Sequence, residues 1–239
     1  MQECKARILV TRVIDESLIE KARASSVSII AIPFITISSL SAEQILQSVS
    51  HLSKLRSTVV FTSASAVHSV ASSSPDTADW GIYCMSRGTL RSVQTHLPGA
   101  EVIGVADNAF VLAQKILDDN QTDEVHFFTG NLHLKQIPDI LTGAGIKVHT
   151  HEVYHTALTP TVVTEDYDGV VFFSPSAVES FISVNAVRKE ATLFAVGQFT
   201  AASLRSFANE VIVSPTPDPI LYIDHIIDYY NKKHDKNKY

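Results

Sequence analysis

The chain of 239 residues has a globular composition, because 45% of its residues are apolar and 18% are charged. Residues 1–230 hold 15 basic and 24 acidic residues, a net charge of −9, and residues 231–239 add four lysines and one aspartate. This composition excludes a disordered chain. An acidic body also lacks the basic stripe that binds a phosphate backbone, so we expect no nucleic acid partner.

Short apolar runs alternate with helix-like stretches along the whole chain. In chain order, the runs expected as strands are 7–10, 27–32, 58–61, 82–85, 102–105, 125–128, 146–154, 170–173, 193–196 and 211–213. The stretches expected as helices are 15–24, 65–71, 88–96, 108–117, 137–141, 177–184, 201–207 and 220–230. Continuous apolar strands that alternate with helices indicate parallel sheets covered on both faces. The predicted fold class is therefore doubly wound α/β.

The sequence also repeats itself. Segment 59–67, VVFTSASAV, matches segment 170–178, VVFFSPSAV, at seven of nine positions, with an offset of 111. At the same offset Thr89 falls on Thr200, and a weaker match relates 9–11 to 127–129. A repeated supersecondary unit predicts two similar doubly wound parallel-sheet domains.

The order of the repeats indicates that one domain is inserted into the other, because the opening unit lacks its second half until residue 170. We predict a first domain over 1–36 and 160–230, an inserted domain over 38–152, and a polar, lysine-rich tail over 231–239. Two connecting strands, near 34–38 and 152–161, would join the domains as a two-stranded connector.

Cysteine usage and hydropathy bear on the compartment. Cys4 and Cys84 have no paired spacing, which argues against a disulfide framework or a cysteine zinc site and fits a reducing cytoplasm. The N-terminal residues lack a signal-peptide pattern, and no stretch approaches the ~20 apolar residues of a membrane span. We expect a cytoplasmic protein without a membrane partner.

The segment His151-Glu152-Val153-Tyr154-His155 is a literal HExxH, which binds zinc when a helix holds both histidines on one face. The surrounding residues 146–156 are rich in β-branched and aromatic types, which predicts a strand. In a strand the two histidines would lie about 13 Å apart, too far for one zinc ion. An exposed polar row that includes His149 is the favoured interpretation, and a zinc hydrolase stays open as an alternative.

Hydroxyl side chains follow several of the expected strands. Singly, each is a helix cap that satisfies unpaired backbone amides. Together they would lie at the carboxyl ends of parallel strands, where open α/β sheets bind ligands and helix starts attract anions. The set is Thr62, Ser63, Ser65, Ser86, Thr89, Ser174, Ser176 and Thr200. No glycine-rich nucleotide motif accompanies it, so we expect no cofactor and no metal.

The chain resembles the uroporphyrinogen-III synthase family over residues 7–230. The resemblance rests on ILVTR (8–12), VFTSASAV (60–67), FFTGN (127–131), VYHT (153–156), VFFSPSAV (171–178) and AVGQFTA (195–201), in this order. It implies two α/β domains and a lyase of heme biosynthesis that closes linear hydroxymethylbilane into uroporphyrinogen III. That reaction inverts ring D, loses water and uses no cofactor, on a tetrapyrrole with eight carboxylates that is bound between the domains.

The resemblance also implies site residues. Tyr154 matches the family's cleft tyrosine and would assist departure of the hydroxyl group. The substrate-binding residues would be Arg12, Thr62, Ser63, Ser65, Ser86, Gly130, Asn131, Ser174, Ser176, Gly197 and Thr200. Leu134 stands where relatives carry an arginine, a loss for which Arg12, Arg87 or His133 would compensate.

One alternative of another class stays open, namely a two-domain protein that binds a small molecule without chemistry. In either case we expect a monomer with a small-molecule partner. Because the net charge would repel an octa-anion within about a Debye length, attraction must come from local donors and helix starts.

Overall fold

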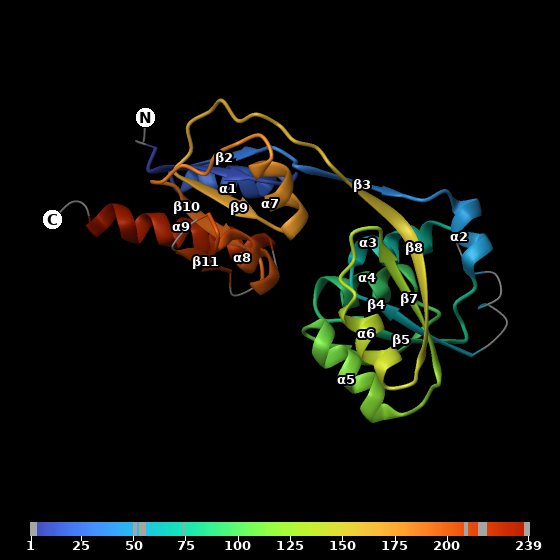
Figure 1. Ribbon diagram of the computed structural model, residues 1–239. Coiled ribbons are helices and arrows are strands. Elements are labelled where there is room, and N and C mark those ends of the chain that lie inside the picture. The colour runs from blue at the N-terminus through green and yellow to red at the C-terminus, as the bar shows by residue number, and fades with distance from the viewer. Residues whose placement is uncertain are drawn as a thin grey trace. The chain divides into compact units, whose positions relative to one another are not determined.

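The computed structural model describes residues 4–49, 52, 56–73, 75–207, 210–214 and 219–236. Contacts within the chain divide it into two compact units, each with its own sheet (Figure 1). Unit 1 comprises Met1–Thr36 and Ala157–Tyr239, and unit 2 comprises Ile37–Thr156. The chain passes from unit 1 to unit 2 in β3 and returns at the end of β8.

Unit 1 has a five-stranded sheet in the order β11-β10-β9-β1-β2, and its neighbouring strands are parallel. The strands are β1 (Ala6–Val10), β2 (Val27–Ala31), β9 (Gly169–Phe172), β10 (Thr192–Ala195) and β11 (Val211–Val213). Helices α1 (Glu16–Ala24) and α9 (Pro219–Lys236) pack on one face, where Ile8 and Val171 point. Helices α7 (Pro175–Ile182) and α8 (Gln198–Leu204) cover the other face.

Unit 2 has a six-stranded sheet in the order β3-β8-β7-β4-β5-β6. The strands are β3 (Ile35–Ser39), β4 (Ser57–Phe61), β5 (Trp80–Met85), β6 (Glu101–Ala106), β7 (Glu124–Gly130) and β8 (Lys147–Leu158). Helices α2 (Ala42–Val49), α3 (Ala64–Ser72) and α4 (Gly88–His96) pack on the face that carries Phe61 and Phe128. Helices α5 (Ala109–Asp119) and α6 (Gln136–Gly143) pack on the face that carries Val60 and Phe127.

The two sheets share one strand order. Reading β2-β1-β9-β10-β11 against β8-β7-β4-β5-β6 pairs β9 with β4, the strands that begin the sequence repeat, and leaves β3 as the additional edge strand of unit 2. Helices cover both faces of each sheet, because successive strand residues alternate between two apolar cores. The doubly wound α/β class is therefore confirmed.

Two elements differ from the sequence expectations. Helix α2 was not expected from the sequence, because its buried apolar residues are just two, Ile45 and Val49, and serines flank it. Helix α9 continues to Lys236, so residues 231–236 of the polar, lysine-rich segment extend a helix that its apolar face already anchors. Among the described residues, no helix has both the length and the apolar character needed to cross a membrane.

Candidate active site

Serine side chains cap two helices at the carboxyl edges of the sheets. The Ser63 hydroxyl accepts hydrogen bonds from the amides of Ser65 (3.1 Å) and Ala66 (3.4 Å) at the start of α3. The Ser174 hydroxyl accepts one from the Ala177 amide (3.2 Å) at the start of α7 and lies 3.0 Å from the Ser176 hydroxyl. These side chains therefore stabilise the helix starts. Thr62, Ser65 and Ser176 lie beside them, and all three are half-buried.

Helices α4 and α8 begin differently, because no described side chain caps either of them. Their N-cap residues, Arg87 and Gly197, have positive φ angles of 63° and 93°. The first-turn amides of both helices are therefore open at the positive end of the helix dipole, an arrangement that favours anions. Thr89 and Thr200 lie buried inside these first turns.

Ser86 precedes α4, and its groups are already engaged. Its amide donates to the Ala106 carbonyl (2.8 Å), and its hydroxyl donates to the Asp107 carboxylate. The side chain thus joins the ends of β5 and β6 in this structure.

Tyr154 owes its position to an irregularity in the pairing of β7 with β8. Thr129 pairs with Glu152, but Gly130 pairs with Tyr154, so the register shifts by one residue between them. Such a shift turns the following side chain to the other face of the sheet. Tyr154 consequently lies on the face of Phe128 and packs, half-buried, against the core beneath α3.

Gly130 provides the space for the Tyr154 ring. A β-carbon on Gly130 would stand 2.5 Å from Cζ and 2.9 Å from Cδ2 of that ring. Ordinary carbon contacts lie at about 3.5–4.0 Å, so only glycine fits beneath the ring as it stands.

Asn131 fixes the backbone on the far side of Tyr154. Its amide donates to the Tyr154 carbonyl (3.3 Å), its side-chain oxygen accepts from the Thr156 amide (2.7 Å), and its Nδ2 donates to the Thr156 carbonyl (3.2 Å). Gly130 and Asn131 therefore both contact strand β8, which carries Tyr154.

Arg12 follows β1 at the carboxyl edge of the unit 1 sheet. Its guanidinium lies 5.0 Å from the ring centre of Phe173, a cation–π contact with the residue that follows β9. The Phe173 ring meets Tyr222 edge-on at 5.1 Å. Burial raises the pKa of Tyr222, an effect that the nearby Arg12 charge opposes.

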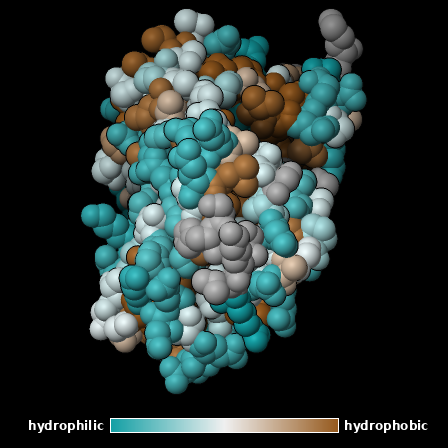
Figure 2. Space-filling model, turned by 90° about the vertical axis from the view of Figure 1, so that its right-hand side faces the viewer, coloured by the Kyte–Doolittle hydropathy of each residue, from teal (hydrophilic) through white to brown (hydrophobic). Residues whose placement is uncertain are grey.

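Large apolar side chains are exposed at the same edges. Figure 2 shows apolar patches among polar residues on the face that it presents. Those that follow strands or begin helices are Val13, Phe199 and Leu221 in unit 1, and Phe110, Val111, Leu132 and Leu134 in unit 2. Leu132 and Leu134 are 54% and 55% exposed, on either side of His133, whose Nδ1 lies 2.9 Å from the Gly130 carbonyl oxygen. The edges thus combine apolar surface with hydrogen-bond donors.

The HExxH segment lies in a strand, β8, as expected, and its members separate. His155 Nε2 lies 3.2 Å from Glu152 Oε1, whereas His151 Nε2 lies 3.0 Å from His126 Nδ1. A zincin needs both histidines on one metal, so the zinc hydrolase alternative is wrong. Among the described residues, no group of three or more His, Cys, Asp or Glu is arranged to hold a metal ion.

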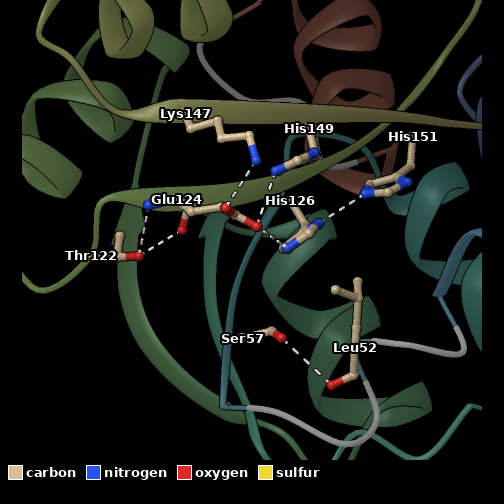
Figure 3. A network of polar contacts seen from close by, with 8 residues as sticks. All are labelled: Leu52, Ser57, Thr122, Glu124, His126, Lys147, His149 and His151. Carbon is tan, nitrogen blue, oxygen red and sulfur yellow. Dashed lines mark hydrogen bonds and ion pairs between the residues drawn. The ribbon is translucent and has the colours of Figure 1, made fainter.

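The expected exposed polar row is a partly buried network instead (Figure 3). His126, buried on β7, stacks with His149 and His151 at ring distances of 4.8 Å and 5.2 Å. Glu124 Oε1 lies 3.0 Å from His149 Nε2 and 3.5 Å from His126 Nε2. The hydrogen bond from His149 is the main reason that the pKa of Glu124 is lowered. Glu124 and His126 were not predicted from the sequence, because only strand pairing places them beside β8.

Fold and site together define a class: a two-unit, doubly wound α/β protein with polar groups and exposed apolar side chains at the carboxyl edges of its sheets. A family model described as uroporphyrinogen-III synthase HemD matches residues 16–220. The chain belongs to the uroporphyrinogen-III synthase family, lyases of heme biosynthesis that act on a tetrapyrrole. Comparison with curated protein sequences gives no match.

Solved structures of the same family share the fold. A mutant uroporphyrinogen III synthase from Thermus thermophilus has a TM-score of 0.71 at 14% identity, covering 95% of this chain and 99% of that one. The wild-type enzyme from the same organism, in another crystal form, has a TM-score of 0.55 at 13% identity, covering 95% and 99%. Uroporphyrinogen-III synthetase from Helicobacter pylori has a TM-score of 0.61 at 15% identity, covering 95% and 100%.

Proposed function

We propose that this chain closes hydroxymethylbilane into uroporphyrinogen III, with inversion of ring D and loss of water, at the carboxyl edges of its two sheets. The observation that carries the proposal is the combination found there: uncapped helix starts at α4 and α8, exposed apolar side chains, and one positioned tyrosine. A linear tetrapyrrole that carries carboxylates needs apolar contacts for its pyrrole rings and hydrogen-bond donors for its carboxylates.

In this proposal the hydrogen-bond donors to the substrate carboxylates are mainly backbone amides. The first turns of α4 and α8 would each bind a substrate carboxylate, and Gly197 lets the chain turn without a side chain in the way. Ser63 and Ser174 act indirectly, because their hydroxyls hold the starts of α3 and α7 in place. Thr62, Ser65 and Ser176 offer further hydroxyls at these turns.

Tyr154 is the catalytic residue in this proposal. Its phenol donates a proton to the departing hydroxyl group as the lone pair of the pyrrole nitrogen expels that group as water, which leaves a cationic azafulvene and the phenolate. The substituted carbon of ring D then attacks the azafulvene carbon to form a spiro intermediate, and its rearrangement releases a proton that restores the phenol. Closing through the spiro carbon rather than directly is a matter of positioning, which Gly130 and Asn131 serve through Tyr154.

We assign Arg12 and Leu134 different kinds of substrate contact. Arg12, held above Phe173, would supply a fixed cation for a substrate carboxylate in unit 1. In unit 2, exposed Leu132 and Leu134 would contact pyrrole rings instead, which leaves anion binding there to α4 and to Arg87.

A test compares purified Tyr154→Phe with the unaltered enzyme on freshly generated hydroxymethylbilane, with isomers III and I resolved. A neutral phenol is a weak acid, so we expect turnover to fall about tenfold to a hundredfold without disappearing. Unchanged turnover would eliminate the role of Tyr154. Production of isomer I alone by the unaltered protein, at the spontaneous rate, would favour the binding protein without chemistry.

We further propose that the protein works as a monomer in the cytoplasm. Cys4 and Cys84 are both free thiols, which suits a reducing compartment. Light scattering of the purified chain tests the monomer, and a mass near twice the 26.1 kDa of one chain would contradict it.

A further inference from the structure

A cavity of about 300 Å³ opens at the edge of the unit 1 sheet where strands β1 and β2 begin. It is lined by Cys4, Arg7, Arg23, Ser26, Val27 and Ser28. Ser174 and Gly197 follow the carboxyl ends of β9 and β10, at the opposite edge of this parallel sheet. The cavity is therefore separate from the active-site groups of unit 1.

The cavity wall carries an excess of positive charge. Arg7 and Arg23 are both exposed, and neither forms an ion pair with a carboxylate among the described residues. Of the neighbouring carboxylates, Asp166 pairs with Arg188 (2.6 Å), whereas Asp168 accepts a hydrogen bond from the neutral Arg7 amide (2.7 Å) and keeps its charge outside this cavity. Arg23 lies in the last turn of α1, where a cation suits the helix dipole, but Arg7 lies in a strand and has no such explanation.

Ser26 provides an independent sign of an absent partner. The residue is 7% exposed, and its hydroxyl is buried without a hydrogen-bond partner. Its backbone is fixed at the cavity wall, since its amide donates to the Arg23 carbonyl (3.0 Å) and its carbonyl accepts from the Lys5 amide (2.8 Å). Leaving a buried hydroxyl unpaired costs free energy, and a hydroxyl turns about a single bond to meet a new acceptor.

We propose that this cavity binds a phosphate group, either inorganic phosphate or a phosphomonoester. Two guanidinium groups and the Ser28 hydroxyl supply donors to a tetrahedral dianion, and the buried Ser26 hydroxyl adds another once its side chain turns toward the cavity. The volume lies at the lower end of the range for small-molecule sites, which suits a ligand of that size.

Cys4 gives a local readout, because its exposed thiol lines the cavity. Cys84 is buried, and burial raises the pKa of its thiol to about 11, so it stays unreactive at neutral pH. The experiment measures the rate of Cys4 alkylation by uncharged iodoacetamide, by peptide mass spectrometry, at fixed ionic strength. Inorganic phosphate and glycerol 3-phosphate are titrated separately. We expect each effective ligand to slow alkylation several-fold in a saturable way.

Variants assign the effect to the cavity. Arg7→Gln and Arg23→Gln are each expected to weaken the apparent affinity at least about tenfold, and Ser26→Ala by less. Arg205→Gln, which removes a cation at the end of α8 outside this cavity, should behave as the unaltered protein. Thermal unfolding confirms that each variant is folded, and Arg23→Lys should restore part of the affinity.

Saturable protection by glycerol 3-phosphate assigns the site to a phosphomonoester, and protection by inorganic phosphate alone assigns it to the free ion. Protection that rises linearly with concentration, or that is the same in Arg7→Gln and Arg23→Gln as in the unaltered protein, would overturn the proposal. Turnover of hydroxymethylbilane by Arg23→Gln is expected to be unchanged, so this proposal and the proposed function are tested independently.

Discussion

Replacing Gly130 with alanine tests how Tyr154 is positioned. The new methyl carbon would stand 2.5 Å from Cζ and 2.9 Å from Cδ2 of the Tyr154 ring, so the ring must retreat by about 1 Å to reach an ordinary contact distance. Overpacking of this kind costs about 1–3 kcal/mol of unfolding free energy. A displacement near 1 Å at a reacting group lowers turnover by up to about a hundredfold, so we expect Gly130→Ala to lose no more turnover than Tyr154→Phe does.

The assay pairs denaturant unfolding with turnover of hydroxymethylbilane. Gly143→Ala is the matched control, because nothing lies within 4 Å of its β-carbon, and we expect it to be neutral or slightly stabilising. The stability cost of Gly130→Ala should vanish in a Tyr154→Ala background, where no ring is left to displace. An equal cost in both backgrounds would refute the argument, since the backbone rather than the ring would then be responsible.

Three further predictions concern backbone strain and charge. Gly197→Ala should lower the unfolding free energy by about 1–3 kcal/mol because of its φ of 93° alone, since no atom lies within 4 Å of its β-carbon. Gly88→Ala, whose β-carbon also meets no atom within 4 Å, should not lower it. Equal unfolding free energies of the two variants by denaturant titration would contradict this. Arg87→Gly relieves φ 63° and should raise stability by up to about 1 kcal/mol while weakening substrate binding, measured as a higher KM. The lowered pKa of Glu124 means that its carboxylate stabilises the fold above pH 4.5 and ceases to do so as the pH falls through that lowered pKa. Glu124→Gln should therefore cost less than about 1 kcal/mol at pH 7, and this cost should disappear as the pH falls below the lowered pKa of Glu124. A cost that persists in acid would show another cause.

Much of the fold follows from local pattern. The apolar runs of β4 and β9 are recognisable because both faces of these strands are buried, and the shared VVF motif reveals their equivalence. Helix α2 was not predicted, because its buried residues, Ile45 and Val49, lie among serines and other polar residues that are equally typical of a loop.

The site is only partly readable from the sequence. The family resemblance indicates Tyr154 and the pair Gly130-Asn131, but not that the pair holds the tyrosine. That relation depends on a register shift between two strands, which local propensity does not encode. The same holds for His126, whose stacking partners His149 and His151 lie on the neighbouring strand. Thr200 was expected among the substrate-binding residues, yet its side chain is buried in the first turn of α8.

The interruption of unit 1 by unit 2 affects synthesis as well as structure. Strand β1 lies between β2 and β9 in the finished sheet, but β9 begins at residue 169. At translation rates of roughly 5–20 residues per second, β1 and β2 would wait on the order of ten seconds for this partner, while all of unit 2 is made. During that interval β1 has an unpaired edge with the apolar sequence RILV, so nascent chains stalled before residue 169 are expected to be the species most prone to aggregation.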